Sequence, residues 1–283
     1  APRTPPVPPP ARMGINSAVL LCLLRPARLL LAEASAVPSL LQTDAYYTNF
    51  SSIDGLWQLD QSCFDCDAKN PDECTKNFIS AVQPASIDES AGLTITTTQK
   101  SNFSWCSPTA GGSSGKLTFT RALSFGTIRV KSRYFPGDSD LVKTAKGFIG
   151  LEDSSSGAIT ITIHGKGASP SGAPKGADWT RYMQSSCYQH GDDHNKEFTA
   201  LGTPVDLAKD YNVFQVDWTS TSVTIKVNDE VVRTVTDASK VPQKPLKVQL
   251  HSRSIAYSEM LQGSNFASLI QEFHFEPQSA SVG

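Results

Sequence analysis

The sequence lacks a marked excess of charge of either sign. Its 283 residues carry 25 lysines and arginines against 27 aspartates and glutamates, which gives a formal net charge of −2. Proteins that hold nucleic acid or an anionic membrane surface by charge need a basic patch or a basic overall balance. We therefore expect neither nucleic acid nor, in the mature form, a membrane as a partner.

The sequence also lacks the local patterns of nucleotide and zinc chemistry. It contains no P-loop and no glycine-rich dinucleotide fingerprint. Cys63 and Cys66 form a CxxC with Cys74 close behind, but no second CxxC or paired histidine follows at the spacing of zinc ligands. We expect no cofactor and no metal, and the cysteines favour disulfides over a zinc site.

The amino-terminal region has little that could build a core. Residues 1–12 are nearly all proline, alanine and arginine, and we expect a disordered proline-rich leader. Residues 13–36 are apolar and end in Ala34-Ser35-Ala36, a small-residue cleavage pattern, so they are interpreted as a secretory signal peptide. The mature protein is then secreted or extracellular, for example in a cell wall. An organelle transit peptide remains an alternative, because the segment has two arginines and one acid.

A secreted chain would use its cysteines for disulfides. If Cys22 is removed with the signal peptide, an odd number remains, which permits two disulfides and one free thiol: Cys63, Cys66, Cys74, Cys106 and Cys187. Two N-x-S sequons, at Asn49 and Asn102, agree with a glycoprotein surface. The pairing of the cysteines stays open.

From residue 45 to residue 277 the sequence is a series of short runs of alternating polarity separated by Gly, Ser, Pro and Asp, with almost no helical period. This pattern predicts one all-β domain, a two-sheet antiparallel β-sandwich or jelly roll. Residues 177–207 hold few strand signals and are interpreted as a long loop. The expected strands are 93–98, 116–121, 126–134, 158–164, 211–218, 222–228, 230–236, 246–251 and 271–275.

Two stretches are especially informative. In residues 158–164 (AITITIH), isoleucines alternate with threonines and a histidine, which predicts a strand with one apolar and one polar face. Asn228 and Asp229 stand between two alternating runs, and these residue types tolerate the positive φ of a two-residue hairpin turn.

The order of these segments resembles glycoside hydrolase family 16, the endo-β-glucanases with a concanavalin A-like jelly roll. The similarity rests on residues 125–134 (FGTIRVKSRY), 211–234 (YNVFQVDWTSTSVTIKVNDEVVRT) and 269–275 (LIQEFHF), and it extends over about residues 50–276. The resemblance implies a cleft for a polysaccharide or oligosaccharide of the β-glucan class.

In that family one strand carries an ExDxE or ExDxxE motif, and a retaining glycosidase needs such a pair of carboxylates beside the scissile bond. The matching positions here are Ala158, Thr160 and Thr162, followed by His164 on the same face. None is a carboxylate, and Ala or Thr cannot replace one as nucleophile or proton donor. If the register differs, Glu152 and Asp153 are the nearest acids, although the composition of EDSSSG favours a solvated turn.

Other polar and aromatic residues could contact a sugar. Trp179, Arg181 and Tyr182 combine stacking rings with a donor, and His164 and His251 could form hydrogen bonds to hydroxyl groups. The alternatives are that Trp179 and Tyr182 pack a loop onto the sheet and that His251 is structural. Trp57 and Trp218 lie in apolar runs and are assigned to the core. Trp105 also lies in a loop-like segment, and a polar cluster formed by His190, Asp192, Asp193, His194 and Glu197 is interpreted as a solvated loop rather than a cation site.

These observations lead to a first hypothesis of a secreted carbohydrate-binding protein that resembles family 16 enzymes, with hydrolysis lost or weak. A second is an active glycoside hydrolase or transglycosylase that acts on β-glucan or a cell-wall polysaccharide. A third is an extracellular structural protein.

Overall fold

A computed structural model describes residues 41–59, 82–84, 92–99, 112–135, 145–153, 155–165, 170–189, 195–254 and 265–278. In these ranges the regular structure consists of strands, from β1 to β16. None of the described segments is a helix long and apolar enough to cross a bilayer. The expected leader and signal peptide, the sequon at Asn102, Trp105 and all cysteines except Cys187 lie outside the described residues.

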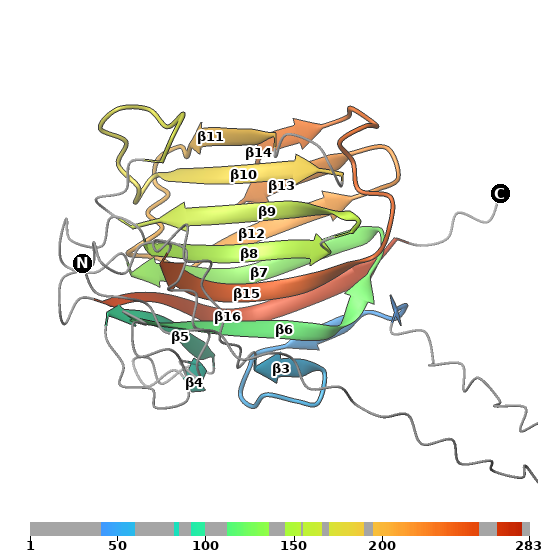
Figure 1. The fold of residues 1–283 in the computed structure, drawn as a ribbon, viewed down its shortest axis with the longest axis horizontal. Coiled ribbons are helices and arrows are strands. Elements are labelled where there is room, and N and C mark those ends of the chain that lie inside the picture. The colour runs from blue at the N-terminus through green and yellow to red at the C-terminus, as the bar shows by residue number, and fades with distance from the viewer. Residues whose placement is uncertain are drawn as a thin grey trace, which may run out of the picture. The chain divides into compact units, whose positions relative to one another are not determined.

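Two antiparallel sheets face each other, and Figure 1 shows one in front of the other. Sheet A has the order β11-β10-β9-β8-β15-β6, and sheet B has the order β5-β16-β7-β12-β13-β14. A short antiparallel pairing of β5 with β6 joins them. This arrangement confirms the predicted jelly-roll sandwich.

The strands of sheet A are β6 (Gly112–Leu123), β15 (Leu246–Ser254), β8 (Ala145–Asp153), β9 (Gly157–His164), β10 (Tyr182–Tyr188) and β11 (Lys196–Ala200). Two short strands, β1 (Leu41–Gln42) and β3 (Trp57–Leu59), pair with β6. The strands of sheet B are β5 (Leu93–Gln99), β16 (Asn265–Pro277), β7 (Gly126–Phe135), β12 (Asn212–Trp218), β13 (Val223–Val227) and β14 (Glu230–Val235). β2 (Tyr46–Thr48) pairs with β16, and β4 (Val82–Pro84) pairs with β5.

The core fills the space between the two sheets. Each strand contributes every second side chain, so Ile159, Ile161 and Ile163 of sheet A are buried in the same cluster as Phe214 and Val216 of sheet B. Burial of a Leu, Ile or Phe side chain contributes about 1.5–3 kcal/mol, so this alternation is the main stabilising feature of the fold. Trp57 and Trp218 belong to this core, as expected.

The hairpin between β13 and β14 also has the expected geometry. Asn228 and Asp229 have φ values of 50° and 67°, the left-handed conformation that a two-residue turn requires. The Asn228 side chain accepts a hydrogen bond from the Val213 backbone N–H at 2.8 Å, which fastens the turn to β12. The turn is therefore stabilised by its own backbone conformation and by the hydrogen bond to β12.

The interpretation of residues 177–207 as a long loop is wrong. This segment contains β10 and β11, and β8 was also missed beside the EDSSSG turn. In β10 (YMQSSCY) the inward positions are Met183, Ser185 and Cys187, which are mostly too polar or small to give a clear apolar alternation. Pairing with β9 supplies the stabilisation that the local sequence does not show.

Candidate functional site

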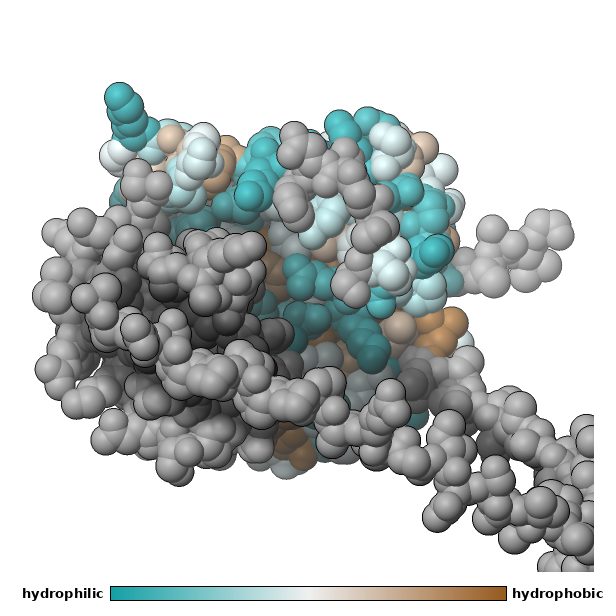
Figure 2. Space-filling view, in the orientation of Figure 1, coloured by the Kyte–Doolittle hydropathy of each residue, from teal (hydrophilic) through white to brown (hydrophobic). Residues whose placement is uncertain are grey.

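Two threonines on the polar face of β9 line a cavity. Thr160 and Thr162 line a cavity of about 210 Å³ on the face of sheet A that points away from the core. We call this the sheet A cavity. Its remaining lining residues come from the neighbouring strands: Lys146, Phe148 and Glu152 from β8, Gln184, Ser186 and Tyr188 from β10, and Lys196 from β11. In Figure 2, hydrophilic residues predominate among the described residues visible in the middle of this face.

Strand register sets the order of these side chains. Thr162 lies between Phe148 and Gln184, and Thr160 lies between Gly150 and Ser186. One step along, Ala158 lies between Glu152 and Tyr188. The cavity thus presents hydroxyl, amide and aromatic groups in regular rows, the mixture that a sugar with polar hydroxyls and apolar C–H faces requires.

Ala158 is buried between its two cross-strand neighbours. It is 1% exposed and does not line the cavity, whereas Glu152 and Tyr188 on either side of it do. Burial raises the pKa of the Tyr188 phenol, and the charge of Glu152 raises it further. The charge of Glu152 therefore reaches Tyr188 across Ala158, the position that the sequence predicts to match the first carboxylate of the family 16 motif.

The two acids considered as a displaced pair have separate positions. Glu152 lines the sheet A cavity. Asp153 is the last residue of β8, where its carboxylate accepts hydrogen bonds from the Ser155 backbone N–H at 2.9 Å and from the Ser155 hydroxyl at 2.5 Å. These bonds lower the pKa of Asp153. Asp153 thus stabilises the β8–β9 turn, and only Glu152 reaches the cavity.

His164, the last residue of the polar face, lies in an aromatic group at one end of β9. Its Nε2 is 3.0 Å from Gln184 Oε1, to which it donates as an N–H, and its ring is 4.7 Å from that of Trp179. Burial lowers the pKa of His164 to about 4, and the charges of Lys146 and Lys196 contribute to this shift. At neutral pH His164 is an uncharged imidazole held by Gln184.

Trp179 is 3% exposed, and its ring packs against His164 of β9 and Phe198 of β11. Tyr182 is half-buried beside it, with ring centroids 6.2 Å apart. Arg181 is exposed at the start of β10. The structure thus brings His164, Trp179 and Tyr182 together.

His251 on β15 lies one strand beyond β8 and stacks on Phe148, with ring centroids 4.1 Å apart and planes 30° from parallel. A Cβ at Gly150 would strike the Phe148 ring, so this glycine leaves the space that the ring occupies. Phe148 lines the cavity whereas His251 is 3% exposed. His251 thus packs against the Phe148 ring from the adjacent strand.

Most of the polar cluster in residues 190–197 lies outside the described residues. Glu197 is described, and its Oε2 is 2.9 Å from Nε of the buried Arg233. Where the structure describes the chain, no group of three His, Cys, Asp or Glu side chains could hold a metal ion. Cys187 is a free thiol in the core, and its Sγ donates to the Lys240 carbonyl at 3.4 Å.

Sequence reasoning missed six of the cavity residues, because they lie on the unpredicted strands β8 and β10 or at the start of β11: Lys146, Phe148, Gln184, Ser186, Tyr188 and Lys196. A period of two is present in Tyr182, Gln184, Ser186 and Tyr188 and could have indicated a strand face. The residues between them, Met183, Ser185 and Cys187, do not form a clear apolar face, so the sequence did not indicate an amphipathic strand.

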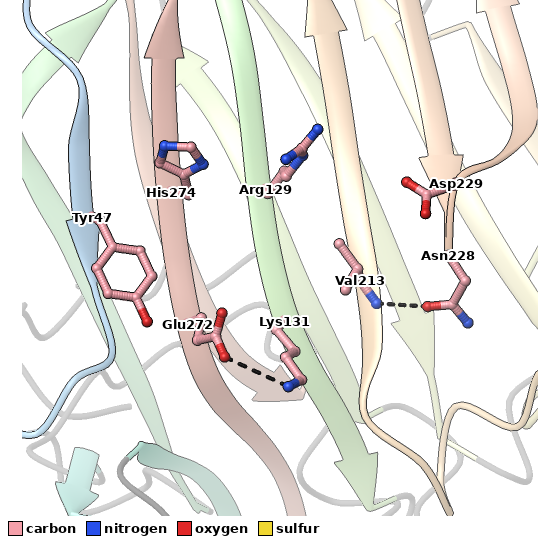
Figure 3. Close-up of a pocket in the computed structure, with 8 residues that line it drawn as sticks. All are labelled: Tyr47, Arg129, Lys131, Val213, Asn228, Asp229, Glu272 and His274. Carbon is pink, nitrogen blue, oxygen red and sulfur yellow. Dashed lines mark hydrogen bonds and ion pairs between the residues drawn. The ribbon is translucent and has the colours of Figure 1, made fainter.

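A larger hollow, of about 430 Å³, lies on the outer face of sheet B. Figure 3 shows that its side chains come from several strands and the β13–β14 turn, with Tyr47 at one side and Asp229 at the other. Lys131 contacts Glu272 at 3.5 Å, and the Arg129 Nε donates to Gln215 at 2.8 Å. Because Lys131 and Arg129 already have partners and β9 contributes no residue to this hollow, we take the sheet A cavity as the candidate site.

Comparison with known proteins gives one family. Residues 75–255 match the model of glycosyl hydrolases family 16. No curated protein matches the chain in a sequence comparison.

Solved structures share the fold at low identity. The Bacillus licheniformis β-glucanase has a TM-score of 0.63 and 17% identity over 84% of this chain and 100% of its own. The Bacteroides ovatus mixed linkage glucan GH16 in complex with G4G4G3G product has a TM-score of 0.62 and 12% identity over 82% and 99%. The Crh5 transglycosylase has a TM-score of 0.55 and 16% identity over 83% and 85%.

Proposed function

The chain belongs to glycosyl hydrolases family 16, and on that premise we propose that it binds a β-glucan or related polysaccharide in the sheet A cavity with hydrolysis lost or weak. One observation carries the proposal: β9 presents Thr160 and Thr162 to the cavity, and Ala158 lies on the same face of this strand. A retaining mechanism needs a nucleophile and a general acid about 5 Å apart. Neither an alanine nor a threonine without a base supplies these roles.

The sheet A cavity contains polar and aromatic groups suited to binding a sugar. Thr160, Thr162, Gln184 and Ser186 offer hydroxyl and amide groups for sugar hydroxyls, and Phe148 offers an aromatic wall. The structural neighbours include a protein in complex with a G4G4G3G product, which supports an oligosaccharide as the ligand class. A cavity of this composition holds a polysaccharide by short polar contacts and ring stacking.

The test measures binding and turnover separately. The purified chain is incubated with laminarin and with mixed-linkage glucan, and binding is measured by affinity electrophoresis while released reducing ends are assayed. We expect retarded migration without release of reducing ends. Thr162→Trp, which fills the cavity, should abolish retardation, whereas Thr224→Val on sheet B should leave it unchanged. Fast release of reducing ends would refute loss of hydrolysis, and absence of binding to any glycan on an array would favour a structural role.

A second candidate function is favoured by the position of Glu152. As a cavity-lining carboxylate beside Ala158, it could serve as the acid of a glycosidase or transglycosylase. Asp153, engaged with Ser155, is not its partner in this geometry. If this candidate holds, Glu152→Gln removes turnover and leaves glucan binding intact, while Glu276→Gln changes neither.

Secretion belongs to the same proposal, because an extracellular polysaccharide requires an extracellular protein. The apolar segment at residues 13–36 and its Ala34-Ser35-Ala36 end support this. Expression with this segment in a secreting host should release a protein whose amino terminus follows Ala36. Retention of the uncleaved chain inside the cell would contradict it.

A further inference from the structure

Asn49 lies in an acceptor sequence for N-linked glycosylation, all three residues of which the structure describes. Asn49-Phe50-Ser51 has the required serine and no proline at its middle position. Asn49 and Ser51 are exposed. Phe50 between them is buried and packs on Trp57, with ring centroids 5.3 Å apart. The buried ring anchors the turn, so the two residues that a glycosyltransferase recognises lie outside the core.

The turn after β2 holds the amide group of Asn49. Its Oδ1 accepts a hydrogen bond from the Ser51 backbone N–H at 3.1 Å. The Phe50 N–H donates to Thr48 Oγ1 at 3.0 Å, and Phe50 has a φ of 54°, which turns the chain at this point. An N-linked sugar is attached to Nδ2 of asparagine, so the hydrogen bond at Oδ1 is compatible with a glycan.

Tyr47 presents an aromatic ring close to this acceptor. Among the large apolar side chains in the described part of the chain it has the greatest exposure, 59%. It precedes Asn49 by two residues, and side chains two positions apart along a strand point to the same face. Its ring meets that of His274 with centroids 6.3 Å apart and planes 70° from parallel, so the two rings are not stacked. A pyranose has apolar C–H faces that can pack on such a ring.

Tyr47 also lines the hollow on the outer face of sheet B, which we call the sheet B hollow, and Figure 3 shows its ring at one side. β2 runs antiparallel to β16 with Thr48 opposite Phe273, so Asn49 follows beside Glu272, another lining residue. The hollow has a volume of about 430 Å³ and is lined mainly by charged and amide groups, which suit sugar hydroxyls. A glycan attached to Asn49 therefore begins at the edge of a polar hollow on its own protein.

We propose that Asn49 carries an N-linked oligosaccharide whose first sugar packs on Tyr47 and whose following sugars cover the sheet B hollow. This inference rests on the proposed secretion, because N-linked oligosaccharides are added in the secretory pathway.

The modification is a group transfer to the Asn49 amide. The donor is a lipid-linked oligosaccharide whose first sugar, an N-acetylhexosamine, is joined through C1 to a diphosphate. The bond between C1 and the diphosphate oxygen breaks, and its electron pair leaves with the diphosphate. A bond forms between C1 and Asn49 Nδ2, and Nδ2 loses one proton to solvent.

The first experiment locates the glycan. The full chain is produced in a eukaryotic secreting host with its own amino-terminal segment and, in a second arm, behind the host's signal peptide. Enzymatic release of N-glycans in heavy-oxygen water labels each glycosylated position, and peptide mass spectrometry distinguishes Asn49 from Asn102. We expect the label at Asn49. Ser51→Ala should abolish it, and the matched control Ser52→Ala should retain it.

The second experiment measures packing on Tyr47 in an Asn102→Gln background, where Asn49 is the only sequon. The glycosylated protein should have a Tm about 2–4 °C above that of its Ser51→Ala variant. The same comparison in Tyr47→Ala should give a smaller difference, because the sugar has lost its ring. Val231→Ala on β14 is the control, since Val231 has a similar exposure of 55%, and it should keep the full difference.

Hydroxyl-radical oxidation reports on the cover over the sheet B hollow. Oxidation of His274, which lines the hollow, should rise in Ser51→Ala, whereas oxidation of Tyr182 on sheet A should stay the same.

The outcomes separate this inference from the proposed secretion. An unlabelled Asn49 in protein that the host has secreted overturns the glycan. A Tm difference that is unchanged in Tyr47→Ala, or an unchanged oxidation of His274, overturns its placement. Label at Asn49 in the second arm, with retention of the uncleaved chain in the first, contradicts the proposed secretion and supports the acceptor site.

Discussion

Glu152 on β8 lies directly across from Ala158 on β9, in the row that also places Tyr188 on the other side of that alanine. A carboxylate thus lies one strand away from the position that the sequence predicts to match the first carboxylate of the family 16 motif. The charge of Glu152 adds to burial in raising the pKa of Tyr188.

Replacement of Glu152 by Gln should therefore lower the pKa of the Tyr188 phenol. The shift is partial, because burial is the larger cause and remains. Ultraviolet titration of phenolate, taken as the difference between each background and its Tyr188→Phe derivative, measures it. The Glu276→Gln variant on sheet B should leave the titration as it is, and an unchanged Tyr188 titration in Glu152→Gln would show that the two groups do not interact.

A second prediction concerns pH and His164. Its pKa is about 4 in the folded protein against an ordinary 6.5, so between these values the unfolded chain binds the proton more readily. The contribution of His164 is complete above pH 6.5 and is lost as pH falls toward 4, and it amounts to about 3 kcal/mol in total. Urea unfolding at a series of pH values measures this loss.

The matched variants are His164→Gln and His274→Gln. In His164→Gln the amide can still donate to Gln184 but cannot take up a proton, so the fall in unfolding free energy between pH 6.5 and 4 should be smaller than in the parent protein. The His274→Gln variant, on the outer face of sheet B, should retain the parent slope. Identical slopes in His164→Gln and the parent protein would contradict the assignment.

A third prediction uses the close approach of the sheets at Gly147. A Cβ added there would strike the ring of Tyr134, a buried residue of sheet B. Overpacking of this kind costs about 1–3 kcal/mol, so Gly147→Ala should lower the free energy of unfolding by that amount. Gly55→Ala is the control, because a Cβ at Gly55 meets nothing within 4 Å. Equal stability of the two variants in denaturant would show that the sheets separate freely at this point.

A fourth prediction concerns the polar link between the sheets made by Arg233. Its side chain extends from β14 of sheet B to sheet A. Nη1 donates to Ser185 Oγ of β10 at 3.0 Å, and Nη2 donates to the carbonyl of Asn195, just before β11, at 2.8 Å. Nε lies 2.9 Å from Oε2 of Glu197 in β11. Arg233→Met keeps much of the packing and removes these contacts, which leaves the buried Ser185 hydroxyl without its donor.

The loss should be about 2 kcal/mol, since an unsatisfied buried polar group costs about 1–3 kcal/mol. The half-exposed Glu197 should add little because water solvates it. Arg129→Met, which removes a single bond to Gln215 on the outer face, should cost less than about 1 kcal/mol. If the two arginine variants unfold at the same denaturant concentration, the link does not stabilise the sandwich.

The sequence predicted the fold where alternation was clear. In β9 the isoleucines alternate with polar residues, and in β13 the valines and the isoleucine do so. This alternation indicates both that the segment is a strand and which of its faces is buried. β10 gave no such pattern, because Ser185 and Cys187 occupy two of its inward positions. β8 gave none, because Gly147 occupies an inward position and the apolar Phe148 lies on the outward face. The pairing of both strands with β9 supplies stabilisation that the local sequence does not show. The prediction therefore failed at the strands that supply most of the cavity.

The sequence by itself determined the sandwich, the face of β9 and the absence of carboxylates at residues 158, 160 and 162, because these depend on residue type and a period of two. Only the tertiary structure decided which other groups join that face. It separated Glu152 from Asp153, stacked Phe148 on His251 and brought Lys146 and Lys196 to one cavity. These relationships depend on the register between strands far apart in the chain, which long-range pairing fixes and local sequence does not record.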